Sequence, residues 1–127
     1  MQEISTFKLD GVALDWAVAM CCSVPVAPDP DAGCLRTIED NEVYSPSRNE
    51  FQAAQVFEHS GVDIYRELGD LWAPQKMWLA ARYVDSGKSL VVGANNPWLA
   101  MLRLFVYAHV GESVLIPDQV LQIAQKD

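Results

Sequence analysis

We expect the chain to fold around the stretch from Asn96 to Gly111, NPWLAMLRLFVYAHVG. Asn96 is a favourable N-cap, Pro97 suits the first helical position, and Gly111 can adopt the left-handed conformation that ends a helix. The apolar side chains between these residues face nearly every direction around the helix axis, which is typical of a buried helix. At about 14 residues, the helix is too short to cross a bilayer. The stretch therefore predicts a central core helix.

In two segments that precede this helix, successive side chains point to opposite faces, as they do in strands. They are Val62 to Leu68 and Met77 to Val84. The connection between them, residues 69–76, contains glycine, aspartate and proline, which favour an antiparallel hairpin. Leu90 to Val92 is interpreted as a short third strand. We therefore predict an α+β fold in which helices pack on a small antiparallel sheet of two to three strands.

Three further helices are expected. Asp10 should cap a first helix, GVALDWAVAMC, with its carboxylate. Asp15 lies off the apolar stripe of that helix and is interpreted as a first-turn acid that the helix dipole favours. Ser47 begins a capping-box pattern for a short helix over residues 49–58. Pro117 begins a last amphipathic helix.

The segment at residues 24–42 has no apolar periodicity and contains three prolines, a glycine and several acids. This composition predicts a long, mobile loop within a single domain spanning residues 1–127. We expect limited proteolysis to cut the chain first in this loop. Asp29 and Asp31 weakly resemble a calcium loop, but the expected third ligand position is a glycine and no closing glutamate follows. Calcium binding is therefore not predicted.

The charge of the chain is unevenly distributed. Of 127 residues with a formal net charge of −8, residues 1–70 hold 13 acids and 4 bases, whereas residues 71–127 hold 4 acids and 5 bases. An acidic face repels the phosphates of nucleic acids, so direct binding to DNA or RNA is not expected. The same face could attract a basic partner, or it could only keep the protein in solution.

The cysteines and histidines do not form a recognisable metal-binding pattern. Cys21, Cys22 and Cys34 include no CxxC pair, and a metal site would require them to converge with His59 or His109. Neighbouring cysteines rarely form a disulfide, and an intracellular thiol usually stays reduced. We therefore expect small, reduced side chains, and neither a metal nor a cofactor.

Three segments carry a family resemblance. The first runs from Leu9 to Ala19, the second is Tyr44-Ser45-Pro46-Ser47, and the third runs from Asn96 to Val106 and continues at Gly111 to Pro117. In this order they resemble the NinX-like proteins, a small phage- and prophage-encoded family of unknown function. The resemblance covers both ends and the middle of the chain. It is loose over residues 23–42 and 51–95.

The sequence departs from this family in two places. The family has an apolar pair followed by an acid and an arginine near Val56 to Ser60, where this chain reads VFEHS. It also has a Thr-Pro step before the last long helix, where this chain has Asn96-Pro97 and so keeps a capping residue. The resemblance implies a phage-related accessory protein, and it transfers no known catalytic residue.

Several functions are compatible with the sequence. The first is a small acidic protein-interaction module that binds a host or phage protein, and the alternatives are a small enzyme with an unrecognised site, a DNA-mimicking inhibitor, or a binder of a small ligand. An enzyme would draw on Asp15, Tyr44, Ser45, Arg103 and His109. The candidate binding residues are Asp15, Trp16, Tyr44, Ser45, Trp98 and Arg103.

The expected setting is the cytoplasm of a bacterial host. No apolar run approaches the roughly 20 residues of a membrane helix, and the first residues, MQEISTFKLD, do not resemble a signal peptide. We also expect a homodimer, because a chain of this size has few elements with which to cover its apolar faces. Large side chains that could anchor the interface are Trp16, Trp72, Trp78 and Trp98.

Overall fold

The computed structural model describes residues 1–67, 77–83, 89–94 and 96–125. The helices of this part are η1 (Thr6–Lys8, a 3-10 helix), α1 (Gly11–Cys21), α2 (Glu50–Ser60), α3 (Pro97–Val110) and α4 (Asp118–Gln125). Its strands are β1 (Gln2–Ser5), β2 (Val26–Asp29), β3 (Cys34–Thr37), β4 (Val43–Tyr44), β5 (Asp63–Glu67), β6 (Met77–Tyr83), β7 (Ser89–Ala94) and β8 (Ser113–Ile116).

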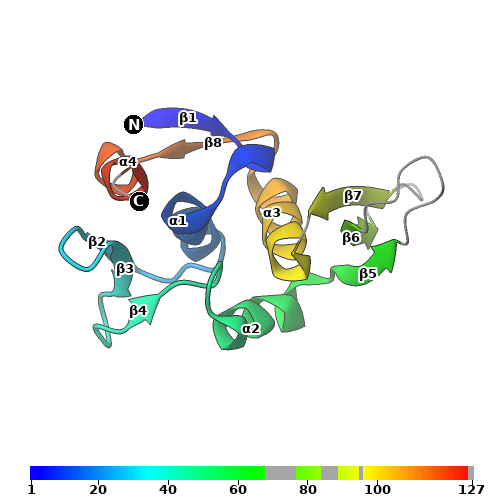
Figure 1. Ribbon diagram of the computed structural model, residues 1–127, viewed down its shortest axis with the longest axis horizontal. Coiled ribbons are helices and arrows are strands. Elements are labelled where there is room, and N and C mark those ends of the chain that lie inside the picture. Colours follow the sequence, from blue (N-terminus) through cyan, green and yellow to red (C-terminus); the bar gives the residue numbers. More distant parts are fainter. Residues whose placement is uncertain (68–76, 84–88, 95, 126–127) are drawn as a thin grey trace.

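The α+β fold is confirmed. α1 and α3 lie at the centre, and three small antiparallel sheets surround them (Figure 1). One sheet pairs β1 with β8, the second has the order β2-β3-β4, and the third has the order β5-β6-β7. α2 and α4 cover the remaining sides, and both chain ends lie near α4 (Figure 1). Among the described helices, none is both long and apolar enough to cross a membrane.

The predicted central helix is confirmed as α3. The side-chain oxygen of Asn96 accepts hydrogen bonds from the backbone N–H groups of Trp98 (2.8 Å) and Leu99 (3.3 Å), as expected for an N-cap. At the other end, Gly111 has a φ of +88° and its carbonyl accepts a 2.6 Å hydrogen bond from the Thr6 hydroxyl. The ends of this helix are therefore fixed both locally and by η1.

The predicted hairpin and third strand are also confirmed. β5 pairs antiparallel with β6, which places Asp63 opposite Ala81, and β6 pairs antiparallel with β7. α3 packs against both β6 and β7, so the sheet beneath the central helix is the one expected. The predicted connection at residues 69–76 and the strand ends at Leu68 and Val84 lie outside the described residues.

The prediction of an irregular loop over residues 24–42 was wrong. This segment contains β2 and β3, which form an antiparallel hairpin extended by β4. Pro28 is tolerated because β2 is an edge strand, where a missing N–H costs no ladder bond. Gly33 turns the chain with a φ of +69°, and an ion pair of 2.7 Å joins Arg36 Nε to Asp29 Oδ2 across the strands. The mobility of the segment stays a prediction.

Two predicted helix caps were wrong. Asp10 occupies the N-cap position of α1, but its side chain makes no capping hydrogen bond. The cap of α2 is Asn49, whose side-chain oxygen accepts from the N–H groups of Phe51 and Gln52. Ser47 is therefore free for a different partner, as described below.

The strand β1 was also not expected, because its four residues gain an extended conformation only by pairing with β8.

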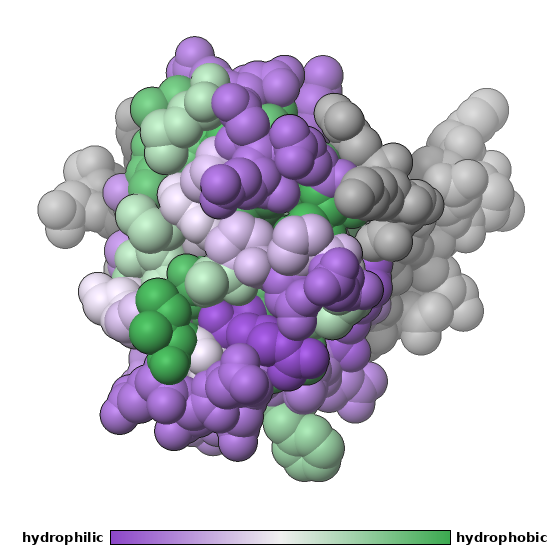
Figure 2. All heavy atoms as spheres, turned by 90° about the vertical axis from the view of Figure 1, so that its left-hand side faces the viewer, coloured by the Kyte–Doolittle hydropathy of each residue, from purple (hydrophilic) through white to green (hydrophobic). Residues whose placement is uncertain are grey.

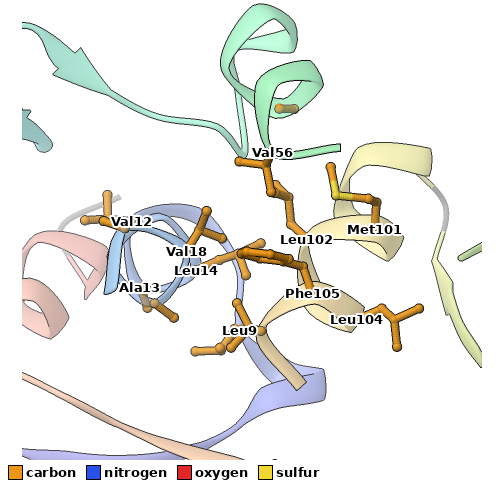
Figure 3. Packing of buried hydrophobic residues seen from close by; sticks show 14 of the residues in the cluster. Leu9, Val12, Ala13, Leu14, Val18, Val56, Met101, Leu102, Leu104 and Phe105 are labelled. Atoms are coloured by element: carbon orange, nitrogen blue, oxygen red, sulfur yellow. The ribbon is translucent and has the colours of Figure 1, made fainter. Parts of the chain in front are cut away.

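The core is formed mainly between α1 and α3. Figure 3 shows Leu14 of α1 and Phe105 of α3 directed toward each other, with Val56 of α2 pointing toward Leu102. Leu14 and Leu102 have no exposed surface. Because interiors are close-packed, these contacts fix how the three helices lie relative to one another.

Candidate functional site

The first predicted site residue, Asp15, is a buried carboxylate. It lies on α1 with only 2% of its surface exposed. Its Oδ1 accepts a 2.7 Å hydrogen bond from the backbone N–H of Ser47, and its Oδ2 accepts a 3.0 Å hydrogen bond from the Ser47 hydroxyl. The interpretation of Asp15 as a helix-dipole acid was therefore wrong, because it bonds to a segment 32 residues away.

Burial raises the pKa of Asp15 from 3.8 to about 6. Removing a carboxylate from water penalises its ionised form, and here this effect exceeds the opposing ones. Both hydrogen bonds from Ser47 and the nearby positive charge of Arg48 lower the pKa. The Ser47 hydroxyl also lies 3.4 Å from the carbonyl oxygen of Gly11, which gives it a second acceptor when the carboxyl is protonated.

Tyr44 lies in the same cluster. Its side chain is buried, its hydroxyl is hydrogen-bonded to the Cys22 thiol, and burial is the largest cause of its raised pKa. Negative charge on Cys22 or Asp15 would raise that pKa further. Burial also raises the pKa of Cys22, and it raises that of Cys21 to about 11. Both thiols are therefore protonated at neutral pH, where the thiolate is the reactive form.

The segment Tyr44–Arg48 is held from two sides. Asp15 holds it from α1, and Gln52 holds it from α2. The side-chain oxygen of Gln52 accepts a 2.6 Å hydrogen bond from the Ser45 N–H, and its nitrogen donates a 2.8 Å bond to the Val43 carbonyl. We call residues 44–48 the anchored segment.

The remaining candidate residues lie outside this cluster. Trp16 is half-buried and packs on the core, and Trp98 makes an edge contact with Phe57 at a ring-centroid distance of 6.3 Å. Arg103 Nε donates a 2.8 Å hydrogen bond to the carbonyl of Leu9, and His109 Nδ1 lies 2.8 Å from a backbone carbonyl of its own helix. The structure thus brings together Asp15, Tyr44 and Ser45. None of the hydrogen bonds recorded for the described residues joins Arg103 to Asp15.

Two cavities open beside the anchored segment. The first, of about 410 Å³, lies at the starts of α1 and α3 and is lined by Asp10, Gly11, Val12, Ser47, Arg48, Asn96 and Leu99. The second, of about 470 Å³, lies between α1, α2 and α3 and is lined by Cys22, Val24, Tyr44, Gln52, Gln55, Val56, Glu58, His59 and Phe105.

Asp15 holds the chain in place and is not presented to either cavity. The described residues that line these two cavities do not include Asp15. Both carboxylate oxygens of Asp15 accept hydrogen bonds from Ser47. No group of three or more histidine, cysteine or acidic side chains within the described ranges is arranged to hold a metal ion.

The protein is thus an α+β protein with a short segment anchored on its central helices. The chain belongs to the bacteriophage P22 NinX family, because the family model described as "Bacteriophage P22, NinX" matches residues 5–109. None of the curated proteins compared with the chain matches it. The resemblance found in the sequence is confirmed. The match spans residues 23–42 and 51–95 as well, whereas Gly111 to Pro117 lies outside it.

Sequence reasoning missed three residues of this cluster. Ser47 was interpreted as a helix cap, Cys22 as a small, reduced side chain, and Gln52 was not considered. The signal for the Asp15–Ser47 bond was present in the resemblance, because the segments Leu9–Ala19 and Tyr44–Ser47 both carry it. Two family segments far apart in the chain are candidates for contact with each other.

Proposed function

We propose that this phage- or prophage-derived protein is an accessory factor that works by binding another protein through an acidic surface. The observation that carries this proposal is three exposed apolar side chains that neighbour acids in the sequence, at the turn between β3 and β4 and at the start of α2. We call this the turn surface. Its members are Ile38, Glu39, Asp40, Glu42, Val43, Glu50 and Phe51.

The apolar members of the turn surface are unusually exposed. Ile38 is 67% exposed, Val43 is 44% exposed and Phe51 is 85% exposed. Figure 2 shows the side of the molecule that carries this hairpin, where hydrophilic residues dominate and apolar residues form small areas between them. An apolar centre with a polar rim is the usual composition of a transient protein interface.

Hydrogen bonds fix the turn before any partner binds. The Thr37 N–H donates to the Glu42 carbonyl (2.8 Å), and the Glu42 N–H donates to the Thr37 hydroxyl (3.1 Å). Arg36 Nη1 donates to the Asn41 carbonyl (3.2 Å), and Asn41 itself has a φ of +54°. A surface that is already ordered loses less conformational entropy on binding.

The charge of the turn surface favours a basic partner from the host or the phage. Its four acids belong to the half of the chain that holds 13 acids and 4 bases. Opposite charges accelerate association and exclude partners of the wrong sign, so DNA and RNA are not expected to bind. We place this interaction in the cytoplasm of the bacterial host.

Reversing the charge of the turn should abolish partner capture. In the variant Glu39→Lys/Asp40→Lys/Glu42→Lys, we expect affinity capture from an infected or lysogenic bacterial lysate to lose the proteins that the wild type retains. The physical reason is that like charges facing each other across an interface are repulsive. The yield of each captured protein is measured by quantitative mass spectrometry.

The control carries the same change in net charge elsewhere. Asp31→Lys/Asp63→Lys/Glu112→Lys alters three exposed acids outside the turn surface. Capture should persist in this control. Equal loss in both variants would show that only the total charge matters, and unchanged capture in both would contradict the proposed surface.

We also propose that the protein forms a homodimer. Trp16 and Trp98 are half-buried, and the side chains of Trp72 and Trp78 lie outside the described residues. Phe7 is more exposed, at 45%, and its ring lies 5.0 Å from that of Tyr107. This exposed ring supports self-association away from the turn surface.

Sedimentation equilibrium tests the dimer. At micromolar concentration the wild type should sediment with twice the chain mass of 14.1 kDa. The variant Phe7→Glu should sediment as a monomer, because a buried unpaired charge is costly. A wild-type mass near 14.1 kDa at every concentration would refute the dimer.

A further inference from the structure

We propose that the 470 Å³ cavity beside Tyr44 is the anchor pocket for the partner, and that it accepts one large apolar side chain flanked by lysine or arginine. This inference rests on the proposed function, since it assigns a ligand chemistry to a cavity next to the turn surface. We call this cavity the Tyr44 pocket.

The inner wall of the Tyr44 pocket is apolar. Tyr44, Val56 and Phe105 line it and are buried, and they come from β4, α2 and α3 respectively. Because each belongs to a different element, the wall is fixed by the core rather than by a loop. The volume falls within the range of about 300–1,000 Å³ that is typical of ligand pockets. It is large enough for an aromatic side chain.

Two polar groups that line the pocket already have partners. The amide of Gln52 bonds to the backbone of Ser45 and Val43, and the Cys22 thiol is hydrogen-bonded to the Tyr44 hydroxyl. A polar ligand would have to compete with these bonds. An apolar side chain leaves them intact and gains by leaving water. The pocket therefore favours an apolar occupant.

The outer edge of the pocket carries a negative charge. Gln55, Glu58 and His59 of α2 are exposed there. The carboxylate of Glu58 lies on the edge, and the exposed acids Glu42 and Glu50 belong to the neighbouring turn surface. Basic residues on either side of the apolar anchor would meet these carboxylates, so charge complementarity selects a basic segment.

One hydrogen bond links the pocket to the turn surface. Tyr44 lines the pocket and follows the exposed Val43, while Gln52 lines the pocket and follows the exposed Phe51. The hydrogen bond from Gln52 to the Val43 carbonyl joins the two elements at this border. We expect one bound segment to fill the pocket and to reach the turn surface across this border. A buried anchor surrounded by weaker contacts is the usual arrangement of a binding hot spot.

Short peptides test the pocket without the natural partner. The probes are Ac-Lys-Trp-Lys-amide, Ac-Lys-Ala-Lys-amide and Ac-Glu-Trp-Glu-amide, and binding is followed by methyl NMR shifts of Val24 and Val56. We expect the Lys-Trp-Lys peptide to shift both methyl signals with saturation below about 10 mM. The Lys-Ala-Lys peptide should leave them unchanged, and the Glu-Trp-Glu peptide should bind at least about fivefold more weakly.

A pocket-filling variant provides the matched control. Gln55→Trp places an indole at the edge of the Tyr44 pocket, whereas Gln119→Trp makes the same change at an exposed glutamine on α4. We expect Gln55→Trp to weaken the Lys-Trp-Lys peptide at least about tenfold and Gln119→Trp to leave its affinity unchanged. Circular dichroism of both variants checks that they keep the fold.

Three results would overturn the proposal: no methyl shift with the Lys-Trp-Lys peptide, equal binding of the alanine peptide, or equal binding of the glutamate peptide. Peptide binding with no charge-sensitive partner capture would support the pocket and contradict the proposed function. Partner capture that survives Gln55→Trp, with no peptide binding, would overturn the pocket and leave the proposed function standing.

Discussion

Replacing Leu102 by alanine is expected to lower the free energy of unfolding by about 2–5 kcal/mol. Leu102 lies in the middle of α3, has no exposed surface and belongs to the core cluster shared with α1 and α2. The loss combines the transfer free energy of the deleted methyl groups with the cost of the cavity that remains. Urea unfolding of the wild type and the variant measures it.

The control for this prediction is Leu115→Ala. It deletes the same atoms from a side chain of β8 that is 54% exposed, so its effect should be much smaller. A change in the free energy of unfolding below about 0.5 kcal/mol for Leu102→Ala would show that Leu102 is not part of the core.

Replacing Asp15 by asparagine is expected to remove a pH dependence of stability. In the folded protein this carboxyl keeps its proton up to about pH 6, whereas its ordinary pKa is 3.8. Between these values the folded state binds more protons than the unfolded state, so stability falls as the pH rises. Above about pH 6 the loss is complete and constant. Its size is on the order of 3 kcal/mol.

The asparagine side chain is neutral at every pH and keeps an oxygen acceptor for the Ser47 N–H. The free energy of unfolding of the wild type should therefore fall between pH 4 and pH 7.5, whereas that of Asp15→Asn should not fall for this reason. Relative to the wild type, the variant is then more stable at pH 7.5 than it is at pH 4. The measurement is the difference between their free energies of unfolding from pH 4 to pH 7.5. Asp63→Asn, at an exposed acid, is the control and should show no such trend. A flat difference for Asp15→Asn would contradict the burial of an ionisable Asp15.

Local signals predicted the centre of the fold well. The Asn96 cap, the proline after it and the glycine at the end define α3, and strand alternation located the sheet that α3 packs against. These features act over a few residues, so they can be recognised in a single sequence.

Features that depend on distant contacts were missed. β1 gains its extended form by pairing with β8 at the opposite end of the chain, and no local pattern marks it. In β2, the prolines rule out a helix but do not rule out an edge strand, as Pro28 shows. The distinction between a loop and a hairpin here depends on pairing, which the composition does not reveal.

The candidate site was found only in part for the same reason. Asp15, Tyr44 and Ser45 were singled out and do lie together, but the residue that joins them is Ser47, whose local pattern equally suits a helix cap. Helix position alone made Asp15 look exposed. Its burial follows from the anchored segment folding across α1, which is a tertiary effect.

Hydrogen–deuterium exchange of the captured complex tests the central proposal most directly. We expect the partner to slow exchange in peptides that cover residues 38–45 and 50–59, which contain the turn surface and the α2 side of the Tyr44 pocket. Exchange in β1 and β8 should stay unchanged by the partner. Protection confined to β1 and β8, with residues 38–45 and 50–59 exchanging as in the free protein, would contradict the proposed binding surface.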